Sequence, residues 1–490
     1  MVFNSLSFLI FFPIAVLGYY LLPQRFKNLW LLVLSYYFYM CWNAVYALLM
    51  FFSTLSTWLC AHWMGKMQAE AGRKLALGVN IGVNLGILFL FKYYDMFMQL
   101  VVDGLALAGI RYTAPVLSLL LPVGISFYTF QALGYSIDVY RGTVKHEKSF
   151  LDYMLFVSFF PQLVAGPIER SANLLPQFHK PHPFVYDNLA MGLRIMLWGF
   201  FKKVVIADNI ALAVDRMYTY IEVFPGPVLL AGVILFGVQI YCDFGGYSDI
   251  AMGAAKALGF DLMENFRRPY FSRSIREFWR RWHISLNTWF TDYVYIPLGG
   301  SRCSRARHLF NLLFVFFLSG LWHGASWTYV CWGLYHGLWL CLETVTLPRV
   351  EALQNRLNGT AAGRLLAVCR VAGTFLAANL GWIFFRSDYF TQVSYLFTHL
   401  HRGWGIFADP LGAAAAFASL ADSTRISLII LVSVLVLFAA ELLEEVRHKR
   451  VYAMAQQLSL PVQWCVYYLL LFGIALFGAF GQSSFIYFQF

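Results

Sequence analysis

Charged residues are scarce in this chain. Asp, Glu, Lys and Arg make up 12% of the 490 residues, 60% of the residues are hydrophobic, and the mean hydropathy is +0.62. A soluble domain has about twice this share of charged residues. A water-soluble fold is excluded because the chain has too few polar residues to cover its long apolar segments. The clearest segments span residues 75–90, 190–201, 227–240, 426–440 and 464–480.

The apolar segments also lack the alternation of polar and apolar residues that is typical of strands in a membrane β-barrel. They are continuous, as helices that cross a bilayer require. We therefore predict an all-α polytopic membrane protein with about a dozen spans in a single transmembrane domain, residues 1–490. Residues 8–22 lack a basic leading segment and a small-residue cleavage site, which predicts a retained span and not a signal peptide.

Metal-binding patterns are missing too. The eight cysteines form no C-x-x-C pair, and the chain has neither an H-E-x-x-H motif nor a zinc-ribbon spacing. We expect no metal site, and we expect the cysteines to act as small buried side chains. His179 and His182 lie in a polar stretch, and His399 and His401 lie beside Arg402, so all four are predicted in loops.

The positive charge is gathered in clusters of Lys and Arg, and the net charge is +11. In a membrane protein such clusters mark cytoplasmic loops, so the charge does not indicate nucleic-acid binding. Most consecutive clusters are separated by enough apolar chain for a helical hairpin. This spacing returns the clusters to one side and predicts a first span that runs from outside to inside.

The densest cluster, residues 261–283, belongs to an Arg-rich region, residues 261–308, that we predict at the cytoplasmic interface. It has six arginines against three acidic residues, with aromatic residues between them. One interpretation is an amphipathic helix that faces lipid headgroups. The other is an anion-binding mouth for a phosphate-bearing donor such as a nucleotide or coenzyme A, with Arg280 and Arg281 as candidate contacts. Both interpretations stay open at this point.

Several apolar segments are interrupted by proline, glycine and polar residues, notably residues 121–126 and 160–167. Such broken backbone at membrane depth is tolerated only where protein buries it or where it lines a water-filled cavity. Residues 284–300 contain Asn287 and Asp292 and end in Pro-Leu-Gly-Gly, which favours a re-entrant or interfacial helix.

Two histidines have unusual surroundings. His323 is set in an apolar, aromatic run, and His283 ends the arginine cluster. Imidazole in hydrocarbon is costly unless it lines a polar cavity or meets a partner. His323 is therefore either satisfied by a neighbour inside the bundle or a general base, since neutral imidazole can deprotonate a hydroxyl near neutral pH. A continuous helix through His323 would place His336 about 220° around and roughly 20 Å along, which excludes a metal pair on one face.

The motifs around both histidines resemble those of the membrane-bound O-acyltransferases. Residues 278–300 read FWRRWHISLNTWFTDYVYIPLGG, residues 320–327 read GLWHGASW, and residues 332–337 read WGLYHG. Residues 161–170, PQLVAGPIER, and 243–249, DFGGYSD, are similar as well. The resemblance covers essentially the whole chain. The YIPLGG segment favours the bacterial branch that acetylates alginate over the D-alanyl branch.

The resemblance implies a ring of about 11–13 tilted transmembrane helices around a central funnel, with re-entrant and interfacial helices. It implies an enzyme of the bacterial inner membrane without a tightly bound cofactor. The acyl donor would be a cytoplasmic thioester such as acetyl-CoA, the acceptor an extracytoplasmic polysaccharide, and the partner a periplasmic SGNH-type transferase beside membrane lipids. His323 and His283 would be catalytic. The residues assigned to substrate binding are Arg280, Arg281, Trp322, Asp249, Asn287 and His336.

The C-terminal span and tail, residues 461–490, end in GQSSFIYFQF. The charge-derived topology places this tail outside, where an aromatic interface belt would explain its composition. The tail also resembles the C-terminal motif of the small partner peptide of the D-alanyl branch. This resemblance leads to the hypothesis that Tyr487 folds back into the funnel and accepts the acyl group, with His323 as the base.

Two alternatives stay open. D-alanyl transfer, or acylation of peptidoglycan or cellulose, would use the same machinery. A transporter of a lipid-linked or anionic solute would also have broken helices and polar residues inside the membrane.

Overall fold

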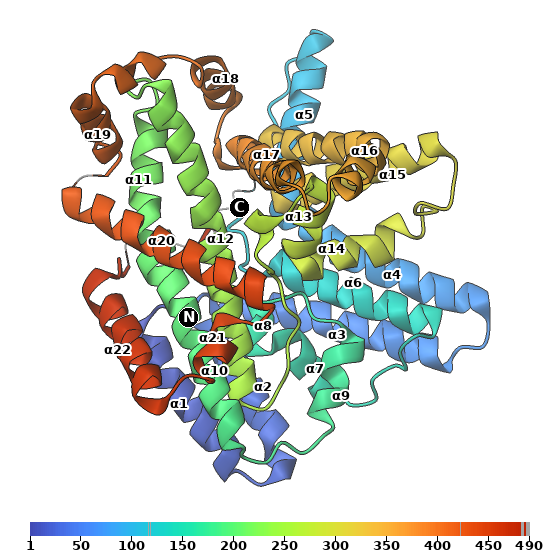
Figure 1. Cartoon of the computed structure of the whole chain (residues 1–490). Coiled ribbons are helices and arrows are strands. Elements are labelled where there is room, and N and C mark those ends of the chain that lie inside the picture. The colour runs from blue at the N-terminus through green and yellow to red at the C-terminus, as the bar shows by residue number, and fades with distance from the viewer. Residues whose placement is uncertain (116, 118, 422, 482–484, 487–490) are drawn as a thin grey trace. The chain divides into compact units, whose positions relative to one another are not determined.

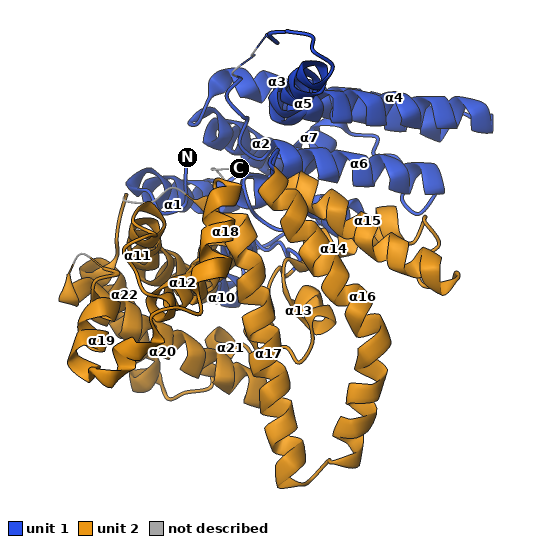
Figure 2. Cartoon of the chain, turned by 90° about the horizontal axis from the view of Figure 1, so that it is seen from above, with its two compact units in different colours: residues 1–192, 251–263, 324–326 blue, residues 193–250, 264–323, 327–490 orange. Residues whose placement is uncertain are grey.

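The computed structural model describes residues 1–490 except 116, 118, 422, 482–484 and 487–490 (Figure 1). The described residues form α-, π- and 3₁₀-helices, and no strand occurs among them. The predicted all-α fold is therefore confirmed. The chain divides into two compact units (Figure 2). Unit 1 comprises residues 1–192, 251–263 and 324–326, and unit 2 comprises residues 193–250, 264–323 and 327–490.

Unit 1 begins with apolar helices whose start points are set by polar caps. The Ser5 side chain accepts a hydrogen bond from the N–H of Phe8 at the start of α1, and the Asn43 side chain accepts one from Val45 at the start of α3. These caps satisfy N–H groups that the first helical turn leaves without partners. The helices are α1 (Leu6–Leu21), α2 (Gln24–Met40), α3 (Ala44–Lys66), α4 (Glu70–Leu88), the π-helix Phe89–Tyr93, α5 (Tyr94–Leu107), α6 (Ile125–Arg141), α7 (Phe150–Ser158), α8 (Phe160–Leu163) and α9 (Ser171–Phe178).

Helices α3, α4 and α6 are joined by a buried polar network. The Asn84 amide nitrogen donates to the hydroxyl of Thr57, at 3.1 Å, and to the side-chain oxygen of Asn80, at 2.9 Å. The Ser53 hydroxyl donates to the Asn84 oxygen at 2.6 Å, and the Asn80 amide donates to the Ser136 hydroxyl at 2.6 Å. Because polar groups in an apolar interior must pair with one another, this network fixes the register of the three helices.

The backbone breaks predicted within residues 121–126 and 160–167 are present in unit 1. Helix α6 starts only after Gly124, and residues 164–170 that follow α8 are not helical. Every residue from 159 to 169 is buried. The protein thus covers this irregular backbone itself, which is one of the two conditions that membrane depth allows.

Unit 2 contains the remaining helices, and two of them, α10 and α12, also have residues in unit 1. They are α10 (Tyr186–Phe200), the π-helix Phe201–Ala207, α11 (Asp208–Thr219), α12 (Gly226–Ala257), the 3₁₀-helix Pro269–Phe271, α13 (Ile275–Arg281), α14 (Ile284–Phe290), the π-helix Thr291–Tyr295, α15 (Arg305–His323), α16 (Trp327–Arg356), α17 (Ala361–Arg386), α18 (Phe390–His399), the 3₁₀-helix Trp404–Ala408, α19 (Pro410–Ala418), α20 (Thr424–Arg447), α21 (Val451–Ala455) and α22 (Leu460–Phe477).

Helices α15 and α16 pack so closely that two positions require glycine. A methyl group on Gly320 would overlap the carbonyl oxygen of Tyr329, and one on Gly333 would overlap that of Phe316. The contacts run in opposite directions along the two helices, so the helices are antiparallel. Small residues at such a crossing bring the backbones together and set the positions of the large side chains beside them.

Six helical stretches of the described chain are long and apolar enough to cross a membrane. The protein is a multi-pass membrane protein. The stretches are Ala44–Lys66, Glu70–Leu107, Gly226–Ala257, Ala361–Arg386, Thr424–Arg447 and Leu460–Phe477. Other apolar segments are divided into shorter helices, as residues 284–300 show: α14 is followed by a π-turn and a non-helical stop, in keeping with a segment that does not span.

Candidate active site

His323 is the last residue of α15 and lies in an aromatic enclosure. Its ring meets the rings of Trp322, Trp332 and Phe385 edge to face, with centroids 4.8, 4.9 and 5.1 Å apart. His323 is only 5% exposed. The surrounding rings exclude bulk water from the imidazole, and electrostatic interactions are stronger in such a low-dielectric setting.

His336 lies on a different helix from His323. Helix α15 ends at His323 and α16 begins at Trp327, so the separation calculated for one continuous helix does not apply to these two histidines. Gly324 favours the break because glycine is a poor helix former, and the chain then turns back along α15. Both imidazoles contact the Trp332 ring, with centroid separations of 4.9 and 5.3 Å.

His283 occupies a strained corner between α13 and α14. Its backbone has a φ of 43°, in the left-handed region that residues other than glycine rarely adopt. The N–H of Ile284 donates to the carbonyl of Asn265 at 2.9 Å, and the N–H of Arg267 donates to the carbonyl of Arg281 at 2.9 Å, which holds the corner on both sides. Strain of this kind persists where the surrounding structure imposes it, and it is concentrated at functional sites.

Both histidines contact one indole, that of Trp322. The Trp322 ring is 6.0 Å from the His283 ring and 4.8 Å from the His323 ring, measured between centroids. His283 is almost fully buried, and burial lowers its pKa to about 3. Its imidazole is therefore neutral at neutral pH and can exchange hydrogen bonds without carrying charge.

A cavity of about 20 Å³ adjoins His283, large enough for one water molecule. Asn287 lines it too, and its amide donates to the carbonyl of Trp279 at 2.7 Å, so this predicted substrate-binding residue also holds the α13–α14 corner. The cavity is lined by Trp279, His283, Leu286, Asn287, Phe290, Val315, Phe316 and Ser319.

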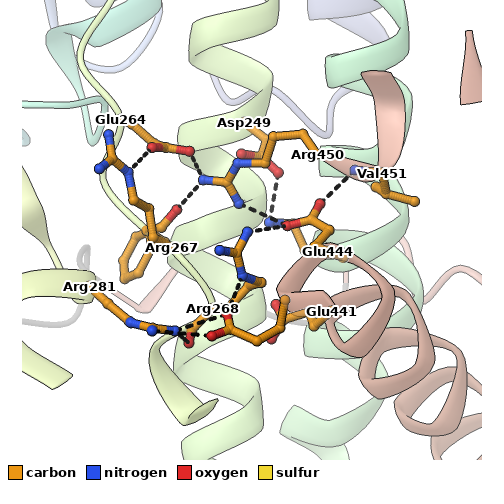
Figure 3. Close-up of polar contacts among 12 residues, drawn as sticks. Asp249, Glu264, Arg267, Arg268, Arg281, Glu441, Glu444, Arg450 and Val451 are labelled. Carbon is orange, nitrogen blue, oxygen red and sulfur yellow. Dashed lines mark hydrogen bonds and ion pairs between the residues drawn. The ribbon is translucent and has the colours of Figure 1, made fainter. Parts of the chain in front are cut away.

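Half of the arginines in the cluster at residues 261–283 are paired with carboxylates of the protein. Arg281 binds Glu277 at 2.6 Å and Glu445 at 3.0 Å. Arg268 binds Glu445 at 2.7 Å, and Arg267 pairs with Glu264. Figure 3 shows Arg268 and Arg281 beside the end of α20, and Arg450, which directly precedes α21, between Glu264 and Glu444. The carboxylates hold the segment in place, and these arginines are engaged within the protein.

The other arginines of the cluster face a cavity of about 700 Å³. Arg280 is exposed there and makes no ion pair within the described chain, whereas Arg276 donates to the hydroxyl of Thr344 at 3.2 Å. The cavity therefore has a positive lining suited to an anion. The lining residues are Arg273, Ser274, Arg276, Glu277, Arg280, Arg281, Leu347, Glu351, Gln354, Asn355, Arg370 and Glu445.

Three of the four aromatic residues between the arginines are buried. Phe278, Trp279 and Trp282 are 0%, 6% and 2% exposed and pack inside unit 2, whereas Phe271 is half-buried. The cluster is also not one amphipathic helix, because α13 covers only Ile275–Arg281. The structure thus favours the anion-binding interpretation over the lipid-facing helix.

Asp249, which lies in α12, forms an ion pair with Lys202. Its carboxylate lies 2.6 Å from the ammonium group of Lys202, close to the pairs shown in Figure 3. A buried ion pair of this kind holds its partners in fixed positions. Asp249 is therefore engaged by Lys202.

The C-terminal tail enters unit 2 beside the same helix. Tyr487, the predicted acyl acceptor, lies outside the described residues. Phe485 and Ile486 are described, and they are 4% and 3% exposed. The Phe485 ring lies 6.2 Å from that of Phe244, whose ring in turn lies 4.7 Å from that of His283, measured between centroids. The tail thus reaches the ring that contacts His283.

Comparison with known proteins places this site in a family. Residues 142–372 match the membrane-bound O-acyltransferase (MBOAT) family. A probable alginate O-acetylase AlgI of Pseudomonas aeruginosa is 41% identical over 397 residues, which cover 79% of this chain and 72% of the relative. The chain belongs to the membrane-bound O-acyltransferase family. It is an O-acyltransferase, and the enzyme interpretation is favoured over the transporter.

Two further relatives of this O-acyltransferase differ in the acceptor that their names state. A peptidoglycan O-acetyltransferase of Helicobacter pylori is 35% identical over 79% of this chain and 77% of the relative. A teichoic acid D-alanyltransferase of Streptococcus thermophilus is 28% identical over 48% of this chain and 60% of the relative. The family match includes both histidines and every lining residue of the arginine-lined cavity except Glu445, whereas the tail lies beyond it.

The sequence interpretation missed one charged group of this acyltransferase. The ammonium group of Lys203 lies 2.7 Å from the carboxylates of both Asp208 and Asp243, and all three side chains are buried. The available signal was the pair Lys202-Lys203 directly after the apolar segment 190–201, since lysine within an apolar run requires a partner. The aspartates that meet it could not be read from spacing.

Proposed function

We propose that this O-acyltransferase moves an acetyl group from acetyl-CoA on the cytoplasmic side of the bacterial inner membrane toward hydroxyls of an extracytoplasmic, alginate-type polysaccharide. The identity of 41% to the alginate O-acetylase, against 35% and 28% for the two other relatives, supports this choice of acceptor. A periplasmic SGNH-type transferase would complete the delivery. The observation that carries the proposal is the contact of the Trp322 ring with both His283 and His323.

The arginine-lined cavity is the proposed entrance for the donor. Guanidinium groups bind phosphate oxygens with paired hydrogen bonds, and coenzyme A carries several phosphate groups. A volume of about 700 Å³ suits a ligand of this size. We assign Arg280 to the phosphates because no carboxylate of the described chain pairs with it, and we assign Arg281 to holding the cavity wall through Glu277 and Glu445.

The first transfer uses Tyr487 as the acceptor. His323 takes the proton of the Tyr487 hydroxyl while the phenolic oxygen attacks the thioester carbonyl carbon. The new C–O bond forms, the C–S bond breaks, and the proton on His323 passes to the departing thiolate. The aromatic enclosure keeps water from hydrolysing the thioester. The neutral imidazole of His283 donates a hydrogen bond to the thioester carbonyl oxygen, where negative charge develops.

The second transfer moves the acetyl group from the tyrosyl ester to the serine of the periplasmic partner and then to a polysaccharide hydroxyl. Each step exchanges one ester for another, so no further reactant is consumed. The buried position of Phe485 and Ile486 supports this route, because it brings the chain that precedes Tyr487 into unit 2.

Membranes that contain the acyltransferase test the proposal when they are supplied with acetyl-CoA labelled in the acetyl group. The wild-type protein is expected to become labelled, and His323→Ala should lower the rate by about 100-fold or more. Tyr487→Phe should remove the label and leave the protein folded. His401→Ala is the matched control because His401 is exposed. Labelling of the His323→Ala protein at the wild-type rate would overturn the assignment of the base.

The acceptor is tested separately. Cells with and without the acyltransferase are compared for acetyl esters on the exopolysaccharide and on peptidoglycan. Loss of esters from the exopolysaccharide alone is expected, whereas loss from peptidoglycan alone would transfer the proposal to that acceptor. A D-alanyl thioester of a carrier protein, supplied in place of acetyl-CoA, should give no label.

A further inference from the structure

Asp243 is placed to hold the C-terminal tail. It lies in α12 and is 2% exposed. One carboxylate oxygen lies 2.7 Å from the ammonium group of Lys203. The other oxygen accepts a hydrogen bond of 2.8 Å from the backbone N–H of Ile486. A single buried side chain thus connects the ion cluster of unit 2 with a residue near the end of the chain.

Lys203 fixes the orientation of the Asp243 carboxylate. Its ammonium group lies 2.7 Å from Asp243 and 2.7 Å from Asp208, and all three side chains are less than 5% exposed. Buried charges are costly to separate, because a lone charge in a low-dielectric interior has no water to stabilise it. The carboxylate therefore has one favoured orientation, in which its second oxygen points at the tail.

The aromatic residues that follow Asp243 fix the register of the tail. The Phe485 ring lies 4.6 Å from the Tyr247 ring and 6.2 Å from the Phe244 ring, measured between centroids. Residues 243 and 247 are one helical turn apart and so share a face of α12. A shift of the tail by one residue would remove both the ring contacts and the hydrogen bond to Ile486.

Two more hydrogen bonds bind the part of the chain that precedes Phe485. The Asn209 amide donates to the carbonyl of Phe477 at 2.9 Å. The N–H of Ala479 donates to the carbonyl of Val204 at 3.1 Å, one residue after Lys203. Backbone groups of residues 477, 479 and 486 thus form hydrogen bonds with the segment 203–209 and with α12.

We propose that Asp243, held by Lys203, is a positioning residue that keeps the C-terminal tail in register for acyl transfer. Its effect on catalysis rests on the proposed function, because Tyr487 follows Ile486 directly in the sequence. The link to the site is Phe244, which contacts both Phe485 and His283. Loss of the hydrogen bond releases the tail and lowers the rate of transfer while the donor site stays intact.

Hydrogen–deuterium exchange of the full-length protein measures how well the hydrogen bonds of the tail protect its amides. In Asp243→Ala, the peptide 478–490 is expected to exchange at least tenfold faster than in the wild type, while peptides from α15 and α16 exchange at the wild-type rate. The turnover number for acetyl transfer should fall at least tenfold, and the KM for acetyl-CoA should not change. Unchanged exchange of the tail peptide would overturn the proposal.

Ile486→Pro removes the donor and leaves the ion cluster untouched, so it carries the test even if Asp243→Ala fails to fold. Its match is Ile486→Val, which keeps the N–H and most of the side chain. Proline should loosen the tail and lower turnover, and valine should do neither. The double variant should be no worse than Asp243→Ala alone, because both changes remove the same hydrogen bond. Wild-type turnover and tail exchange in Ile486→Pro would contradict the proposal.

Tyr487→Phe separates this proposal from the relay on which it rests. If Tyr487→Phe transfers acetyl at the wild-type rate, the relay fails. Faster exchange of the tail in Asp243→Ala would then still show that Asp243 binds the tail, without an effect on turnover. If Tyr487→Phe is inactive and Asp243→Ala leaves the tail protected, the relay stands and the role of Asp243 fails. Asp215→Asn is the control, since Asp215 is exposed and pairs with Arg386.

Discussion

The ring of Phe244 lies edge to face against the imidazole of His283, with the two centroids 4.7 Å apart. Phe244 belongs to α12, next to Asp243, whose carboxylate accepts a hydrogen bond from Ile486, while His283 belongs to the corner between α13 and α14. Because His283 in turn contacts Trp322, a continuous line of rings runs from α12 to the residue beside His323. A shift of the tail or of the arginine-rich segment would therefore reach the same rings.

The left-handed backbone of His283 predicts an order of stability among its variants. His283→Asn should fold with nearly wild-type stability, because asparagine tolerates the left-handed region. The free energy of unfolding of His283→Ala should be lower by about 1–2 kcal/mol, because the left-handed conformation is unfavourable for alanine. Thermal unfolding of the two variants in detergent measures the difference.

Acetyl transfer by the same His283 variants tests the imidazole itself. His283→Ala should lose transfer because alanine has no group that can donate to the thioester, whereas the amide of His283→Asn can donate and should keep more of the rate. His283→Gly is the control for the backbone, because glycine adopts the left-handed region freely. Wild-type transfer in His283→Gly would mean that the residue serves the fold alone.

Neighbouring arginines are predicted to fail in different ways. Arg280→Ala should raise the KM for acetyl-CoA about tenfold without a change in melting temperature, since one hydrogen-bonded charge contributes about 1.5 kcal/mol. Arg281→Ala should lower the melting temperature, because Glu277 and Glu445 lose their partner. The test compares steady-state kinetics and thermal unfolding of both variants.

Ionic strength adds a check on Arg280. The wild-type KM for acetyl-CoA should rise with salt, because salt screens charges in an open cavity. The rise should be smaller in Arg280→Ala. Arg267→Ala is the control, since Arg267 is largely exposed and pairs with Glu264. Equal effects of Arg280→Ala and Arg267→Ala on the KM would contradict the assignment.

The fold class and the two histidines could be predicted from the sequence because their signals are local. Apolar run length indicates membrane helices, and an imidazole in an apolar run stands out in any window. The sequence could not predict that Arg281 forms ion pairs and Arg280 does not, since the difference depends on Glu445, which lies 164 residues from Arg281. The residues next to the two arginines in the sequence do not indicate this difference.

The same limit applies to His336 and Asp243. The turn between His323 and His336 could not be predicted, because a single weak helix former such as Gly324 in a run of strong apolar signal is easily passed over. The partner of Asp243 lies 243 residues away, and it is a backbone N–H, which any residue but proline supplies. No side-chain pattern can reveal such a contact.

Glu169 predicts how the stability of the protein depends on pH. It lies outside the six candidate spans, accepts hydrogen bonds from the N–H of Met263 and the amide of Asn173, and is 2% exposed. Burial raises the pKa of this carboxyl from 4.5 to about 7. Its contribution to stability is therefore fully present below pH 4.5 and is lost as the pH rises through 7.

The melting temperature of the wild-type protein should accordingly fall between pH 5 and pH 8. The free energy of unfolding should fall by at most about 3 kcal/mol over this range. Glu169→Gln keeps the shape and the acceptor oxygen but cannot ionise, so its melting temperature should change less over the same range. Glu222→Gln, a change at another acidic residue, is the control. Parallel pH profiles of the wild type and Glu169→Gln would exclude Glu169 as the source.

The polar network of unit 1 predicts a change in stability without a change in chemistry. Asn84→Ala removes the side chain that binds Ser53, Thr57 and Asn80 at once, and it leaves the Asn80 amide oxygen without that donor. Hydrogen bonds between membrane helices contribute about 0.6–1.7 kcal/mol, so the loss should be about 1–2 kcal/mol. The melting temperature should fall, while the turnover number of the folded fraction stays at the wild-type value. Ser56→Ala is the matched control, since the Ser56 hydroxyl donates only to the carbonyl of Ser53 on its own helix. Equal melting temperatures for the two variants would show that the network does not hold the helices together.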